Sequence, residues 1–201
     1  MTEATANIKS KLLKQLADKR ILILGLGQTG LSCVRFLASF GLEFAVNDSR
    51  ENAMDEAAFS RDYPNCRLVQ GKWDAKLIAS AEVILASPGI DMNDAEISAA
   101  VSPGCQVWGD VELFSRICDI PVLAVTGSNG KSTVVSLLAH LADCLGKNAA
   151  LGGNVGVPVL DLLAKAPELV ILELSSFQLE TISSMQPLAA SVLNLSGDHL
   201  D

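Results

Sequence analysis

At residues 125–133 the chain reads VTGSNGKST, and this stretch decides its fold. An apolar run typical of a buried strand precedes it at residues 122–125, and a helical pattern follows at residues 132–145. A glycine-rich turn between a strand and a helix gathers unpaired backbone N–H groups at the positive end of the helix dipole. The sequence therefore predicts a phosphate-binding loop in an α/β fold.

Each residue type in this loop suits a nucleotide triphosphate and its magnesium ion. Glycines let the backbone approach phosphates, Lys131 can reach the terminal phosphates, and the hydroxyl of Ser132 or Thr133 can ligate Mg²⁺. The strict pattern has a glycine where this chain has Val125, so an ordinary glycine-rich turn is the alternative. We predict ATP and Mg²⁺ as cofactors, with ATP contacts from Gly127, Ser128, Asn129, Gly130, Lys131, Ser132 and Thr133.

A carboxylate stands at the end of the apolar run at residues 170–172. This residue, Glu173, lies where the acid of a second strand approaches the metal of a phosphate-loop enzyme. We predict that it is a metal ligand, and the alternative is a solvated acid at a strand end.

A second glycine-rich turn, GLGQTG, occupies residues 25–30 between a strand-like run at 20–25 and an amphipathic stretch at 31–40. Asp48 follows the next strand, at residues 44–47, so the spacing is close to a dinucleotide fingerprint. Such a turn serves any ligand with a pyrophosphate and a ribose, and both NAD and a UDP-sugar fit. Because a dehydrogenase has no use for an ATP loop, two nucleotide sites favour an ATP-driven enzyme with a nucleotide-tagged substrate.

Further strand-like runs at residues 83–86, 169–174 and 190–195, and a helical stretch at 111–117, continue the alternation of strand and helix. We predict an α/β chain with a Rossmann-like parallel-sheet domain at residues 1–109. The first part of a P-loop ATPase-type α/β domain would follow at residues 110–201. Since no helix closes the last strand, we expect that domain to be truncated and a C-terminal domain to be absent.

Composition narrows the class of partner. The chain has 201 residues, is 49% apolar and carries a net charge of −8 at pH 7, which disfavours nucleic-acid and anionic-membrane surfaces because both require a basic field. Five widely spaced cysteines indicate reduced, mostly buried thiols. Neither a signal peptide nor an apolar run of about 18 residues is apparent. We expect a cytoplasmic monomer without nucleic-acid or membrane partners.

Four blocks of the sequence resemble the Mur ligase family, whose members join amino acids to a UDP-muramoyl peptide at the expense of ATP. They are GLGQTG at 25–30, ASPGI at 86–90, VTGSNGKST at 125–133 and LELSSFQLE at 172–180, and the closing NLSGDHLD at 194–201 also fits. Together they span nearly the whole chain in family order. The first and fourth blocks are most similar to the members that add D-glutamate to UDP-N-acetylmuramoyl-L-alanine.

The resemblance implies roles for individual residues. The catalytic residues would be Lys131, Glu173 and His199, and the metal ligands Ser132, Glu173 and His199. The UDP-substrate site would comprise Gly27, Gln28, Thr29, Asp48, Ser49, Arg50, Ser87, Pro88, Gly89, Asn154 and Ser175. By contrast, His140 in the helix after the phosphate loop is expected to be structural.

The implied reaction is amide formation through an acyl phosphate, with UDP-N-acetylmuramoyl-L-alanine and D-glutamate as substrates. The L-alanyl carboxylate would attack the γ-phosphate of ATP, and the D-glutamate amine would then displace phosphate. Charge neutralisation by Lys131 and Mg²⁺ and in-line positioning would supply most of the rate. Members of the family continue past residue 201 into the D-glutamate site and a modified lysine, so we expect these 201 residues alone to be inactive.

Three alternatives remain open at this point. The first is another ATP-dependent amide ligase, such as a different Mur ligase or a folylpolyglutamate synthase. The second is a nicotinamide oxidoreductase that rests on the first glycine turn. The third is a nucleotide-binding module without catalytic activity.

Overall fold

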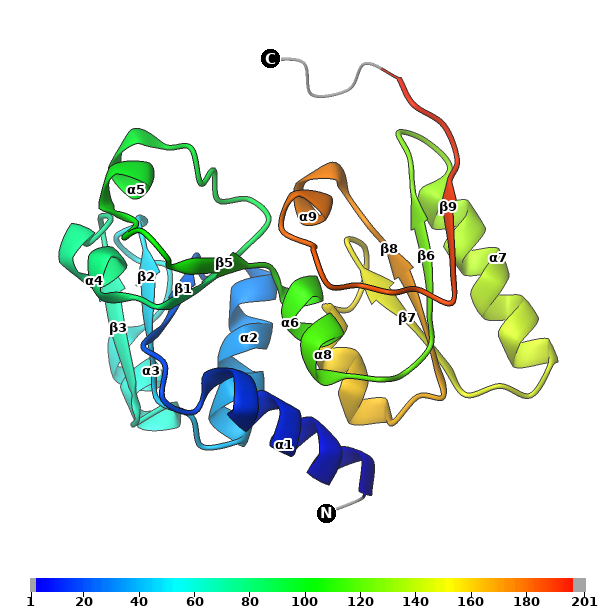
Figure 1. Cartoon of the computed structure of the whole chain (residues 1–201), viewed down its shortest axis with the longest axis horizontal. Coiled ribbons are helices and arrows are strands. Elements are labelled where there is room, and N and C mark those ends of the chain that lie inside the picture. Colours follow the sequence, from blue (N-terminus) through cyan, green and yellow to red (C-terminus); the bar gives the residue numbers. More distant parts are fainter. Residues whose placement is uncertain (1–2, 197–201) are drawn as a thin grey trace.

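The computed structural model describes residues 3–196 and contains two parallel β-sheets with helices packed on them (Figure 1). In spatial order the first sheet consists of β3 (Cys66–Gln70), β2 (Phe44–Asp48), β1 (Ile21–Leu24), β4 (Val83–Ala86) and β5 (Gln106–Trp108). All neighbouring strands in it are parallel. The helices of this unit are α2 (Gln28–Ser39), α3 (Glu56–Asp62), α4 (Ala75–Ser80) and α5 (Ala95–Ala100). The predicted Rossmann-like sheet is confirmed.

Alternate side chains of β1 serve opposite faces of this sheet, as the two-residue period of a strand requires. Ile21 and Ile23 belong to the apolar cluster that contains α2, whereas Leu22 and Leu24 pack in a second cluster with Ile78 of α4. Because helices cover both faces, all four β1 residues are apolar and buried.

The second sheet consists of β7 (Ala149–Gly153), β8 (Leu169–Glu173), β6 (Val122–Thr126) and β9 (Ala189–Val192), again all parallel. Helix α7 (Lys131–Cys144) follows the phosphate loop and covers one face, where Val135 packs with Val125 and Ile171. The shorter elements are α8 (Val159–Leu162), the 3-10 turn η1 (Leu163–Lys165) and α9 (Ser176–Glu180).

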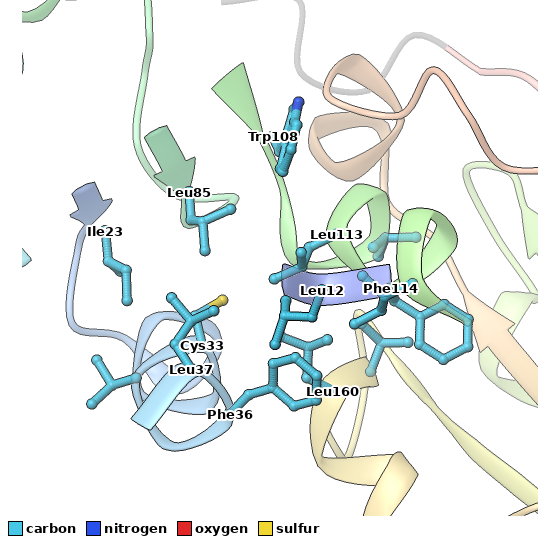
Figure 2. Packing of buried hydrophobic residues seen from close by; sticks show 14 of the residues in the cluster. Leu12, Ile23, Cys33, Phe36, Leu37, Leu85, Trp108, Leu113, Phe114 and Leu160 are labelled. Atoms are coloured by element: carbon cyan, nitrogen blue, oxygen red, sulfur yellow. The ribbon is translucent and has the colours of Figure 1, made fainter. Parts of the chain in front are cut away.

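Helices α1 (Glu3–Leu16) and α6 (Asp110–Ile117) lie with α2 and α8 between the two sheets (Figure 1). One apolar cluster runs through all four helices, and it includes Leu12, Phe36, Phe114 and Leu160 (Figure 2). An ion pair of 2.6 Å between Arg35 Nη2 and Asp161 Oδ2 also joins α2 to α8. The two sheets therefore share one core, although the predicted domain boundary at residue 109 stays a prediction.

Two carboxylates of α6 are fully buried in this region and differ in their partners. Glu112 accepts hydrogen bonds from the amides of Ser183 and Ser184, the hydroxyl of Ser183 and Nε of Arg116, at 2.7–2.9 Å. Neither carboxylate oxygen of Asp110 accepts a hydrogen bond of ordinary geometry from the described residues. Burial, opposed in part by nearby amides such as that of Val111, raises the Asp110 pKa to about 6.

Most of the predicted runs coincide with observed elements, and their ends move by a few residues. Helix α2 begins at Gln28, earlier than the predicted residue 31, because Gly27 is its N-cap and the glycine turn enters the helix. Strand β9 ends at Val192, earlier than the predicted residue 195. The expectation of mostly buried thiols is wrong, because of the five cysteines only Cys33 is fully buried. Between residues 3 and 196, no helix is both long and apolar enough to cross a membrane.

Candidate functional site

The first glycine turn connects β1 to α2, and its three glycines differ in what they face. Gly25 has a φ of 87°, which favours glycine, and a Cβ at Gly30 would lie 1.9 Å from the carbonyl oxygen of Gly25. Gly27, in contrast, has no atom within 4 Å of its Cβ position. The fold thus requires Gly25 and Gly30, while Gly27 leaves room beside the N-terminus of α2.

The carboxylate of Asp48, at the end of β2, is saturated with donors. Its Oδ2 accepts from Leu26 N at 2.6 Å and Arg50 Nη2 at 2.8 Å, and its Oδ1 accepts from Arg50 N and Nε, both at 2.9 Å. Burial opposes ionisation, but the hydrogen bonds from Arg50 and Leu26 outweigh it and lower the Asp48 pKa to about 2. Asp48 therefore ties the glycine turn to Arg50 and has no oxygen lone pair to spare.

A cavity of about 470 Å³ opens above this turn. All of the predicted UDP-substrate residues except Ser175 line it, namely Gly27, Gln28, Thr29, Asp48, Ser49, Arg50, Ser87, Pro88, Gly89 and Asn154. The second sheet's unit contributes further lining that sequence reasoning missed: Gly153, Gly156, Pro158 and Gln178. The glycine cluster at residues 152–156 was the available signal for this wall.

The phosphate loop leaves β6 and enters α7. Gly127 has a φ of 138° and Gly130 a φ of 83°, both in the region that favours glycine. Lys131, the first residue of α7, donates from Nζ to the carbonyls of Gly127 at 2.7 Å and Ser128 at 3.3 Å. The lysine is thus held at the loop, within reach of a phosphate bound there.

The segment after β9 forms hydrogen bonds to the phosphate loop that the sequence did not predict. We call these contacts the brace. Asn194 accepts from the amide of Asn129 through Oδ1 at 2.8 Å and donates from Nδ2 to the carbonyl of Asn129 at 2.9 Å. The amide of Ser196 donates to the hydroxyl of Ser128 at 2.9 Å. The loop's shape thus depends on a segment far along the chain.

Glu173 lies at the end of β8 and is buried, so the alternative of a solvated strand-end acid is wrong. Its Oε2 accepts from the hydroxyl of Ser132 at 2.8 Å, and its Oε1 accepts from Nδ2 of Asn154 at 3.2 Å. A carboxylate and a hydroxyl beside a phosphate loop are oxygen ligands of the kind that Mg²⁺ prefers. The two predicted metal ligands within the described residues are therefore brought together, and the residues present fit the ion.

The third predicted ligand, His199, lies outside the described residues. His140 is exposed on α7, with its Nε2 3.7 Å from Sγ of Cys144.

Two further cavities connect the first cavity to the phosphate loop. The second, of about 500 Å³, shares Ser87, Pro88, Gly89, Ile90 and Asn154 with the first. The third, of about 460 Å³, shares Asn154, Ser175 and Phe177 with the second. Its lining also includes Gly127, Ser128 and Lys131. The three cavities therefore adjoin one another from the first glycine turn to the phosphate loop, and together they are called the hollow.

Comparison with known families agrees with this arrangement. Residues 19–109 match the family described as "Mur ligase MurD-like, N-terminal domain", and residues 125–201 match the "Mur ligase middle domain". The chain belongs to the Mur ligase family.

The named relatives of this Mur ligase chain are similar over most of its length. A protein of Colwellia psychrerythraea is 55% identical over 92% of this chain, and one of Marinobacter nauticus is 45% identical over 92%. Each is named UDP-N-acetylmuramoylalanine–D-glutamate ligase. The Mur ligase chain spans 43% and 42% of the lengths of these two relatives.

A solved structure agrees on the fold of the Mur ligase chain. It is the UDP-N-acetylmuramate:L-alanyl-gamma-D-glutamyl-meso-diaminopimelate ligase from Neisseria meningitides, with a TM-score of 0.54 and 22% identity. The match covers 91% of this chain and 62% of that structure. At this identity the comparison bears on the fold alone.

The Mur ligase chain places Ser175 outside the first cavity. Ser175 is the N-cap of α9, and it forms a capping box in which its hydroxyl accepts from the amide of Gln178 at 3.2 Å. It lines the second and third cavities instead. Gln178 lines the first cavity, so its hydrogen bond to Ser175 connects the wall of the first cavity to that of the other two.

Proposed function

We propose that this chain is the part of a UDP-N-acetylmuramoylalanine–D-glutamate ligase that binds the UDP substrate and the phosphates of ATP. The observation that carries the proposal is the row of three adjoining cavities, with a glycine-rich turn at the N-terminus of a helix at each end. The names of the relatives supply the substrates: UDP-N-acetylmuramoyl-L-alanine and D-glutamate. Because this chain spans less than half of those relatives, the complete reaction is proposed for the whole enzyme.

In this proposal the first cavity holds the UDP group. Helix α2 begins beside the open side of Gly27. The free N–H groups of its first turn and the positive end of its dipole would face the diphosphate. The guanidinium of Arg50, fixed by Asp48, adds a cation at the same rim. The rest of the substrate would extend through the second cavity and bring its L-alanyl carboxylate to the phosphate loop.

At the loop, Lys131 and the backbone amides would hold the triphosphate, so that the L-alanyl carboxylate and the γ-phosphate meet in line. Ser132 and Glu173 would hold Mg²⁺, which neutralises charge on the phosphates when bound. The carboxylate oxygen forms a bond to the γ-phosphorus and ADP leaves, giving an acyl phosphate. The amine of D-glutamate then attacks the acyl carbon and displaces phosphate. The chain's own contribution is positioning and charge neutralisation rather than a nucleophile.

The state of Asp48 distinguishes this turn from the usual dinucleotide fingerprint. In the dinucleotide fingerprint, the acid after the second strand accepts hydrogen bonds from ribose hydroxyls. Here four donors already occupy that carboxylate, two of them from the Arg50 guanidinium. The cradle therefore offers a cation and backbone amides instead of a free carboxylate. A cytoplasmic location, a monomeric state and the absence of nucleic-acid and membrane partners accompany the proposal.

Isothermal titration of the chain with UDP-N-acetylmuramoyl-L-alanine and, separately, with NADH tests the first site. The expected result is binding of the UDP compound that weakens about tenfold or more in Arg50→Ala, since hydrogen bonds to charged groups contribute about 1.5–3 kcal/mol. The matched control is Arg67→Ala, because Arg67 lies on β3 and lines a separate cavity with Ala45 and Leu77. Tighter binding of NADH, or equal effects of the two arginine variants, would refute the assignment.

A further inference from the structure

Asn154 lies where the three cavities of the hollow meet. Among the described residues that line those cavities, it is the one that all three share. The residue is exposed, in contrast to the buried Glu173 beside it. A ligand that extends from one cavity into the next would therefore pass Asn154.

The backbone holds Asn154 against the end of β8. The amide of Asn154 donates to the carbonyl oxygen of Glu173 at 2.8 Å. The preceding residue, Gly153, has a φ of 107°, and a Cβ there would lie 2.4 Å from the same carbonyl oxygen. This close approach fixes where the Asn154 side chain starts, whatever its rotamer.

The side chain then extends the contact to the phosphate loop. Nδ2 of Asn154 donates to Oε1 of Glu173 at 3.2 Å, and Oε2 of Glu173 accepts from Ser132 at 2.8 Å. A side-chain amide carries two donor hydrogens, and the described contacts use one of those on Asn154. A path of two hydrogen bonds thus connects the wall of the first cavity to the first turn of α7.

We propose that Asn154 is a positioning residue that couples the two nucleotide sites of the ligase. One amide hydrogen orients the carboxylate of Glu173, and the other donates to an oxygen of the UDP ligand. A UDP ligand then orders the amide and the carboxylate together, so that the phosphate-loop site receives an oriented Glu173. The inference rests on the function proposed above and adds a regulation to it.

The coupling must act in both directions, because linkage between two binding sites is reciprocal. A ligand that has already ordered Asn154 and Glu173 removes part of the ordering cost for the other ligand. We therefore expect UDP to tighten the binding of magnesium and a non-hydrolysable ATP analogue about tenfold, within the usual range of such couplings.

Calorimetry of the full-length enzyme, titrated with the magnesium–ATP analogue with and without saturating UDP, measures this coupling. In Asn154→Ala the ratio of the two dissociation constants should fall to about one, while both ligands still bind. Asn154→Asp retains the size and the backbone hydrogen bond but has no side-chain donor, so it should also lose the coupling. The matched control is Asn93→Ala, because Asn93 lines the second cavity and has no described contact with Glu173.

The outcomes separate this inference from the proposed function. If both ligands bind to the wild type and the coupling ratio is unchanged in both Asn154 variants, the positioning role is overturned and the function stands. If UDP fails to bind at all, both are overturned. Circular dichroism of each variant checks that it is folded, and loss of coupling in Asn93→Ala as well would also contradict a specific role for Asn154.

Discussion

Replacing Asp110 with asparagine should make the protein more stable at neutral pH. Asp110 is the first residue of α6, and its carboxylate is buried in the region between the two sheets without a hydrogen-bond partner of ordinary geometry among the described residues. Burial disfavours the ionised form and raises its pKa from 3.8 to about 6. Asparagine has nearly the same shape and no charge, so it removes the unfavourable ionisation and keeps the packing.

The magnitude follows from the two pKa values. A carboxyl group whose pKa is raised by folding contributes stability that is complete below its unfolded pKa and is lost as the pH rises through its folded pKa. One pKa unit corresponds to about 1.4 kcal/mol, so a shift of roughly two units corresponds to about 3 kcal/mol. Relative to Asp110→Asn, the wild type should therefore lose about 3 kcal/mol of unfolding free energy between about pH 3 and about pH 7.5.

Urea unfolding of both proteins at several pH values tests this expectation. The fluorescence of Trp108, which is buried on β5, is a suitable probe. The difference between the two proteins cancels the titration of every other carboxyl group, including Asp48, whose pKa is lowered. The carbon chemical shift of the Asp110 carboxyl group gives an independent pKa. A difference in stability that stays constant across this pH range, or a measured pKa close to the ordinary value of 3.8, would refute the reasoning.

Three further predictions concern the cradle and the core. Gly30→Ala should unfold or strongly destabilise the protein, because its Cβ meets the Gly25 carbonyl. Gly27→Ala should fold normally and lose affinity for the UDP compound. Thermal unfolding measures the first effect, and calorimetry measures the second. Glu112→Ala should cost about 3–5 kcal/mol in urea unfolding, because it leaves Arg116 and the amides of Ser183 and Ser184 without their acceptor. Asp48→Asn should lower stability above about pH 4, and that loss should shrink as the pH falls towards about 2, since the wild-type carboxylate is stabilising only while ionised. A pH-independent loss in Asp48→Asn would contradict the last of these.

The sequence predicted the two glycine-rich turns between strand and helix well, because each is a local pattern. Some turns have a backbone conformation or close packing that only glycine accommodates, as at Gly25, Gly30 and Gly127. Such positions can be recognised from the sequence. The buried strands beside them were legible for a similar reason, since helices on both faces make them continuously apolar. Strand β7 was not predicted, because its sequence, AALGG, has low intrinsic strand preference. Its strand conformation depends on the pairing with β8.

Contacts between distant segments could not be predicted. The wall formed by Gly153, Pro158 and Gln178 reaches the first cavity because α2, α6 and α8 pack in one core. No local pattern predicts that Arg50 and the amide of Leu26 would donate to the Asp48 carboxylate. Nor does one predict that Asp110 would be buried without a hydrogen-bond partner of ordinary geometry among the residues described. These features depend on tertiary placement, which overrides what each segment prefers alone.

The hydrogen bonds between Asn194 and Asn129 bear on the order in which the chain folds. The two residues are 65 positions apart, and β9 must pair with β6 before their side chain and backbone can meet. Contacts of such long sequence separation form late, because the entropy of closing the intervening loop is lost before they are gained. We expect the loop at residues 127–130 to reach its final shape only after β9 has paired with β6, so that any binding of nucleotide at this loop follows that pairing.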